Sequence, residues 1–76
     1  MPGPIANFTR QRRKALRLTQ PELAAKAGVG LRFVRELELG KATLRLDKVN
    51  QVLALFGHEL VAAPQVREPD EITETR

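Results

Sequence analysis

A glycine-containing turn at residues 28–30 separates two short segments with helical signals, and it limits the possible folds of this chain more than any other feature. The segment before the turn begins with a capping box, in which Thr19 caps the helix and Glu22 is its partner three residues on. Gly28 can end that helix, because it reaches a left-handed conformation without a Cβ clash. We therefore expect one helix over residues 20–27 and another over residues 31–39.

Apolar residues also repeat at steps of three and four on both sides of this pair. The repeat before it predicts a helix over residues 5–17. The repeat after it predicts a helix over residues 46–56, which Gly57 ends. The chain is therefore expected to be all-α, with four to five helices and a short loop at residues 41–45.

A strand is expected only after Gly57, because residues 58–64 are short, partly β-branched and bounded by Pro64. One strand alone cannot pair its backbone, so its partner would be the same segment of a second copy, antiparallel in a symmetric homodimer. The residues expected at this dimer interface are Phe56, Glu59, Leu60, Val61 and Ala62.

These signals divide the chain into four parts. Residues 1–4 form an N-terminal extension, residues 5–57 the helical domain and residues 58–64 the dimerisation strand. Residues 65–76 form an acidic, polar tail without periodicity, for which disorder is expected.

The composition argues against an enzyme. Among 76 residues there is no cysteine and no serine, and His58 is the single histidine, so neither a Ser or Cys triad nor a cysteine zinc site can be assembled. No apolar run approaches the roughly 20 residues of a spanning helix. We expect a cytoplasmic protein with no catalytic residues, no metal, no cofactor and no membrane partner.

The charge is distributed unevenly along the chain. Residues 1–63 carry eleven Lys and Arg against five Asp and Glu, a net charge of +6, whereas residues 64–76 carry two against four, a net charge of −2. A basic body attracts polyanions, and a phosphate backbone is the commonest one. RNA is disfavoured relative to DNA, because three Phe and no Tyr or Trp leave few platforms for base stacking.

Two short helices joined by a tight turn form a helix-turn-helix arrangement, in which the second helix enters the major groove of DNA. At about 100° per residue, Val34 and Leu37 share one side of that helix. The opposite side carries the candidates for reading DNA, with Leu31 at its edge: Arg32, Arg35, Glu36 and Leu39.

The two arginines can reach guanine O6 and N7 or phosphates. Glu36 can accept a hydrogen bond from cytosine N4 or hold Arg32 through an i,i+4 pair, and the pair is favoured. Leu31 offers apolar contact to a thymine methyl, whereas Phe33 is expected to pack. A run of basic residues before the helix pair fits either a phosphate-binding stripe or a solvated helix face, and we favour the solvated face: Arg10, Arg12, Arg13, Lys14 and Arg17.

Residues 8–61 resemble the Xre/Cro-type helix-turn-helix family, with its lambda-repressor-like fold, and within it the HipB-like antitoxins. The resemblance is carried by Leu18-Thr19-Gln20 and Glu22-Leu23-Ala24 at the second helix and by Glu38-x-Gly40-Lys41 at the end of the third. Leu46-Asp47-Lys48-Val49 is more typical of the HipB-like branch. Many relatives have Ser or Thr where this chain has Gly30, and polar residues at positions 31 and 33, so their operator contacts cannot be copied wholesale.

The resemblance implies a homodimeric repressor of its own operon that neutralises a HipA-like kinase toxin; the alternative is a phage-type or stand-alone repressor with no toxin. It also implies that Gln20 contacts a phosphate and that Arg13 pairs with Glu38 inside the fold. The expected partner is a palindromic operator in double-stranded DNA, which would place the bound protein on the nucleoid. Together, the helical pattern and the resemblance give these candidate DNA-binding residues: Thr19, Gln20, Gly30, Leu31, Arg32, Arg35, Glu36 and Lys41.

Overall fold

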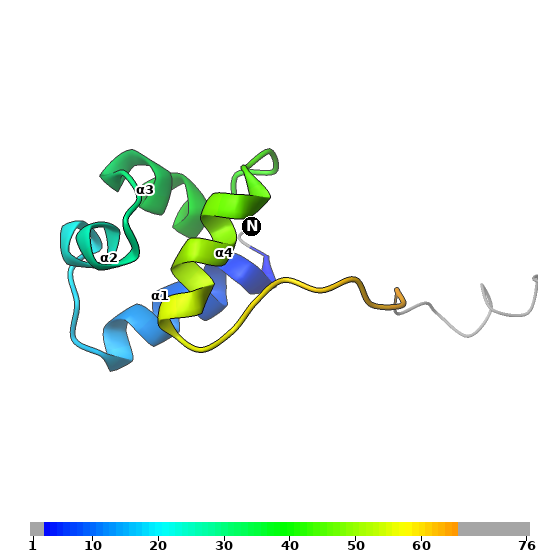
Figure 1. Ribbon diagram of the computed structural model, residues 1–76, viewed down its shortest axis with the longest axis horizontal. Helices are drawn as coiled ribbons and strands as arrows, with labels where there is room; N and C mark the ends of the chain where they lie inside the picture. The colour runs from blue at the N-terminus through cyan, green and yellow to red at the C-terminus, as the bar shows by residue number, and fades with distance from the viewer. Residues whose placement is uncertain (1–2, 66–76) are drawn as a thin grey trace, which may run out of the picture.

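The computed structural model describes residues 3–65, and over that range the chain forms four α-helices and no strand (Figure 1). The all-helical prediction is therefore confirmed. The helices that flank the glycine turn match their predicted ranges, and the first helix begins one residue earlier and ends two residues earlier than predicted. The bounds are α1 Pro4–Ala15, α2 Gln20–Ala27, α3 Leu31–Leu39 and α4 Leu46–Leu55.

All four helices end with main-chain hydrogen bonds. Two or three N–H groups beyond each helix donate back to carbonyl oxygens near its end, which satisfies groups that would otherwise lack partners. At the end of α2, the N–H groups of Gly28 and Val29 both donate to the Ala24 carbonyl, each over 3.0 Å. Such an end needs one residue with positive φ, and α2, α3 and α4 use a glycine there: Gly28, Gly40 and Gly57.

The end of α1 is the exception, because a side-chain-bearing residue occupies the left-handed position. Arg17 has φ 60°, and the next N–H, from Leu18, donates to the Arg13 carbonyl over 3.0 Å. This turn explains why the helix ends at Ala15, although the predicted range runs to residue 17.

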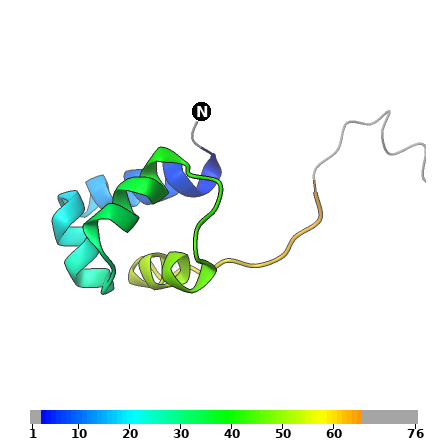
Figure 2. The same cartoon turned by 90° about the horizontal axis from the view of Figure 1, so that it is seen from above.

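The helices enclose one core. Helix α3 packs against α1 and α2, and α4 packs against α2 (Figures 1 and 2). The most deeply buried apolar side chains come from three of the helices: Leu23 of α2, Val34 and Leu37 of α3, and Val52 of α4. Because α2 and α3 bury side chains in the same core, the position of α3 relative to α2 is fixed.

The predicted strand at residues 58–64 is wrong for the single chain: residues 58–65 leave the domain as an extended arm without a strand (Figure 1). The physical reason is that a lone strand has no backbone to pair with. A side chain satisfies one donor of this arm instead, since Asn50 Oδ1 accepts a hydrogen bond from the Leu60 N–H over 2.8 Å.

Two further predictions concern the ends of the chain and the membrane. Most of the predicted acidic tail, residues 66–76, lies outside the described residues, as do residues 1–2 of the predicted N-terminal extension. None of the helices in residues 3–65 is long and apolar enough to cross a membrane.

The helix ends generate a paired prediction about stability. Replacing Gly28 with Ala should lower the free energy of unfolding by about 1 kcal/mol, because the left-handed conformation is costly for a residue with a Cβ atom. The added Cβ itself would make only an ordinary contact, 3.6 Å from Gln51 Nε2. Replacing Arg17 with Gly should have the opposite sign, with a gain of up to about 1 kcal/mol. Urea unfolding followed by circular dichroism measures both changes, and equal losses in the two variants would contradict this account.

Candidate nucleic-acid interface

Helix α3 has two unlike sides. Val34 and Leu37 are buried in the core, with 0% and 2% of their surface exposed. On the other side, Arg35 is exposed and the Arg32 side chain is 90% exposed. Both arginines are therefore open to solvent.

Glu36 lies between two cations on the exposed side of α3. Its Oε2 accepts from Arg32 Nε over 3.2 Å, and its Oε1 lies 3.4 Å from Lys41 Nζ. Both carboxylate oxygens therefore have cationic partners. Of the two roles considered for Glu36, this geometry fits the pair with Arg32 better than a contact with cytosine.

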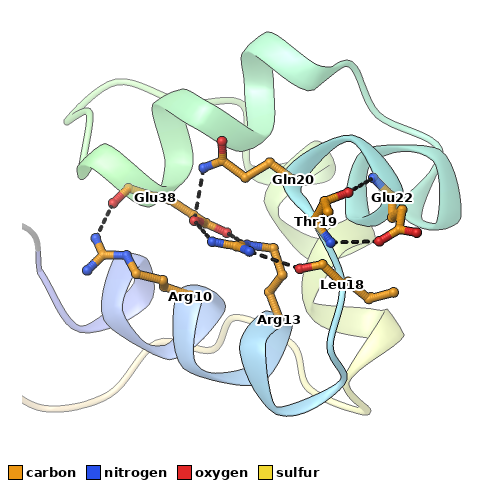
Figure 3. Close-up of polar contacts among 7 residues, drawn as sticks. All are labelled: Arg10, Arg13, Leu18, Thr19, Gln20, Glu22 and Glu38. Carbon is orange, nitrogen blue, oxygen red and sulfur yellow. Dashed lines mark hydrogen bonds and ion pairs between the residues drawn. The ribbon is translucent and has the colours of Figure 1, made fainter.

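A second carboxylate, that of Glu38, is buried at the end of α3 and accepts hydrogen bonds from two other elements (Figure 3). Arg13 of α1 binds it with two donors, Nε to Oε2 at 2.7 Å and Nη2 to Oε1 at 3.0 Å. Gln20 of α2 donates Nε2 to Oε1 over 3.1 Å. The Arg13 guanidinium also donates from Nη1 to the carbonyl of Leu18, over 2.9 Å. One network thus joins α1, the link to α2, α2 itself and α3.

Arg10 adds a contact at the same place. Its Nη2 donates to the main-chain carbonyl of Glu38 over 2.8 Å (Figure 3). A carbonyl in the last turn of a helix lacks a partner within the helix, and positive charge is favourable at that end. Arg10 therefore stabilises the end of α3, a structural role for one member of the basic run on α1.

The network sets the ionisation of Glu38. Burial raises the pKa of its carboxyl group, but hydrogen bonds from Arg13 and Gln20, with the charges of Arg13 and Arg10, outweigh burial and hold the pKa below its ordinary value. A group with a lowered pKa in the folded state stabilises the fold above its unfolded pKa. This contribution is lost as the pH falls through the lowered value.

The first residues of α2 are already engaged in the fold. Thr19 and Glu22 form the predicted capping box, with Thr19 Oγ1 accepting from the Glu22 N–H over 3.2 Å and Glu22 Oε1 from the Thr19 N–H over 2.8 Å. The Gln20 amide uses Nε2 for Glu38, and Figure 3 shows its oxygen directed away from that contact. Gln20 is thus held in place by Glu38.

A hollow of about 320 Å³ lies between α1, α2 and α3, beside the exposed arginine side. Gln20 and Arg35 line it together, although 15 residues separate them in the sequence. Leu39, which was expected on the DNA-reading side of α3, is 76% exposed and lines this hollow, and so does Arg10, for which a solvated face was favoured. The three-residue step from Arg10 to Arg13 was the available signal, because it puts both on one face of α1.

The remaining candidates lie at the edges of the site. Gly30 precedes α3 without a side-chain cap, and Lys41, which follows α3, is exposed. Leu31 is half-buried and packs against the core, as does Phe33, so only part of Leu31 is available for contact with a base.

The residues expected at a dimer interface differ in how deeply they are buried. Phe56 is 8% exposed and packs edge-on against Phe8, with ring centroids 6.1 Å apart, so it belongs to the core of its own chain. Leu60 is half-buried against that core. The other three lie exposed on the arm: Glu59, Val61 and Ala62.

A family model described as helix-turn-helix matches residues 10–60 of the chain. The chain belongs to this helix-turn-helix family. It is also 46% identical over 67 residues to the uncharacterized HTH-type transcriptional regulator y4mF of Sinorhizobium fredii (strain NBRC 101917 / NGR234), a match that covers 87% of this chain and 88% of that relative. These matches confirm the predicted helix-turn-helix family and the prediction of a DNA-binding transcriptional regulator rather than an enzyme.

The buried ion pair generates a double-mutant prediction. Replacing Arg13 with Met should lower the free energy of unfolding by about 3–5 kcal/mol, because it leaves the Glu38 carboxylate buried without its main partner. Replacing both Arg13 and Glu38 with Met should recover much of that loss, since no unpaired charge then remains. Chemical denaturation of the three proteins measures this, and a single-variant loss below about 1 kcal/mol would show that Glu38 does not depend on Arg13.

Proposed function

We propose that this regulator is a repressor that binds a palindromic operator as a homodimer, with α3 in the major groove. One observation carries the proposal: Arg32 and Arg35 project from α3 into solvent while the opposite side of the same helix is fixed in the core. The groove is wide enough for one helix, and arginine reads guanine through two parallel hydrogen bonds. The two copies of α3 would lie about 34 Å apart, or a multiple of that.

Arg32 and Arg35 differ in their neighbours within the protein. Arg32 donates to Glu36 and can be oriented by it, whereas Arg35 lies beside Gln20 in the hollow. We assign base reading to Arg32 and Arg35, with Thr19, Gln20, Gly30 and Lys41 at the phosphates. Glu36 then acts by positioning Arg32, and Leu31 by a partial apolar contact at the edge.

We further propose that the chain is the antitoxin of a HipA-like kinase and regulates its own operon. The support is the resemblance of residues 46–49, Leu-Asp-Lys-Val, to the HipB-like branch. In the structure these residues form the first turn of α4, where Arg45 holds Asp47 through Nε to Oδ1 at 3.1 Å. An operon repressor of this kind would reside on the nucleoid when bound.

Base reading by Arg32 can be tested by substitution. Arg32→Ala should weaken binding to the duplex upstream of its own gene by about 1–3 kcal/mol and relax the preference for one base pair. Gln20→Ala should instead weaken all sequences alike. Arg45→Ala removes one positive charge at a position outside α3. This control variant should change only the salt dependence of DNA binding. Fluorescence anisotropy with operator and scrambled duplexes measures these effects, and an unchanged ratio of the two affinities in Arg32→Ala would remove Arg32 from base reading.

The antitoxin proposal has a separate test. Co-expression with a kinase-like protein encoded next to this gene should suppress the growth arrest that the kinase causes alone, and the two proteins should copurify as one complex. Growth arrest that persists, with no complex, would overturn the antitoxin assignment and leave the repressor assignment standing.

A further inference from the structure

The hollow between α1, α2 and α3 carries an excess of positive charge. Among the arginines that line it, Arg13 is neutralised by Glu38, with 2.7 Å between Nε and Oε2. The other two, Arg10 and Arg35, form no ion pair with any residue between 3 and 65. Arg10 donates instead to the main-chain carbonyl of Glu38 (Figure 3). This cationic hollow is therefore suited to an acidic occupant.

An apolar side chain lies among these cations. Leu39 lines the cationic hollow and is 76% exposed. A phosphate group gives an exposed leucine no apolar contact. A peptide with an apolar residue beside its acids can cover Leu39 and pair with the arginines as well. The hollow thus fits a short segment in which acidic and apolar residues follow one another.

The acidic tail contains such a sequence, since residues 70–72 are Asp-Glu-Ile. Most carboxylates of the helical domain, by contrast, already have partners in the fold. Glu22 belongs to the capping box, and three others are in ion pairs: Glu36, Glu38 and Asp47. The tail is therefore the main source of carboxylates that can neutralise Arg10 and Arg35.

The arm is anchored near the cationic hollow. Leu60 donates its N–H to Asn50 Oδ1 of α4 over 2.8 Å, and it lines a second hollow with Leu37 and Gly40. Leu39, which lies between those two residues in the sequence, lines the cationic hollow. Both hollows therefore border the end of α3.

The chain beyond Leu60 is long enough to pass from one hollow to the other. Ten residues lead from Leu60 to the first acid of the Asp-Glu-Ile sequence, and they span up to about 33 Å when extended. A helix with its side chains is only about 10–12 Å wide. Residues 61–65 are exposed and make no backbone hydrogen bond within the described chain, so no such bond holds the arm in its outward direction. The tail can therefore return to the hollow of its own chain.

We infer that residues 70–72 of the tail dock in the cationic hollow of their own chain and compete there with DNA. The two acids pair with Arg10 and Arg35, and the isoleucine covers Leu39. Because Gln20 and Arg35 line the hollow and are assigned to DNA, the hollow cannot hold the tail and a duplex at once. This inference rests on the proposed function and adds a means of regulating the same site.

Tethering makes a weak contact sufficient. A segment joined to its site through a short linker acts at an effective concentration of the order of millimolar. A tail that occupies the hollow for about nine-tenths of the time raises the apparent dissociation constant for DNA about tenfold. The tail therefore sets the DNA concentration at which the regulator binds.

A nitroxide label on the tail tests the docking without DNA. The chain has no cysteine of its own, so Thr73→Cys places the label beside the docked segment. The inference predicts that the label broadens the methyl NMR signals of Leu39 more strongly than those of Leu16, which is 53% exposed and is not among the hollow residues. Adding Ile72→Asn should remove that difference.

Mixed samples identify the chain that supplies the tail. Nitroxide-labelled chains without isotopes are mixed with isotope-labelled chains without nitroxide. Docking within one chain predicts no excess broadening of Leu39 in this mixture. Excess broadening as strong as in chains that carry both labels, or no excess at Leu39 in either sample, would overturn the inference.

The competition with DNA is tested by a variant that leaves the charge of the tail unchanged. Ile72→Asn keeps all four carboxylates of the tail, yet it should tighten binding to the operator duplex by about threefold to tenfold, because the hollow is vacated. Val66→Asn makes a matched apolar-to-amide exchange outside the docked segment and should leave the affinity unchanged. Fluorescence anisotropy measures both, and wild-type affinity in Ile72→Asn would overturn the competition.

The two kinds of measurement separate this inference from the proposed function. If the Leu39 signals broaden as predicted but neither the wild-type chain nor any tail variant binds a duplex, the proposed function is wrong and the docking stands. Operator binding that depends on Arg32, without excess broadening at Leu39, would contradict the docking alone.

Discussion

The buried carboxylate of Glu38 is the constraint on which the position of α3 depends. A carboxylate with its side chain 4% exposed is costly unless donors surround it, and here the donors come from α1 and α2. Arg13 and Gln20 reach it with hydrogen bonds of 2.7–3.1 Å. Because these donors are fixed only when α1, α2 and α3 are packed together, satisfying one charge couples three helices. The exposed side of α3 is thereby oriented by contacts on its hidden side.

The two carboxylates of α3 illustrate how burial separates roles on one helix. Glu38 is surrounded by protein donors and has a structural role, whereas Glu36, two residues earlier, lies among cations at the surface. The arginine that Glu36 holds is the most exposed charged group of the described ion pairs. A surface pair of this kind contributes little to stability and leaves Arg32 free to exchange its partner for a base or a phosphate.

The sequence predicted those parts of the fold that local signals determine. The capping box at Thr19 and the glycine at position 28 specified α2 completely, because each acts within a few residues. The end of α1 was missed, since a left-handed Arg17 has no sequence signature comparable to glycine. The strand was predicted from β-branched composition, which cannot tell whether a pairing partner is present. Arg10 was assigned to a solvated face because its partner, the carbonyl of Glu38, lies 28 residues away and is set only by tertiary packing.

The central claim is that the arginine side of α3 enters the major groove. Isotope-edited NMR of the full chain bound to the duplex upstream of its gene tests it most directly. The account predicts intermolecular NOEs from the side chains of Arg32 and Arg35 to base protons that face the major groove. A complex in which those two side chains show no contact with bases, while α1 or the arm does, would contradict it.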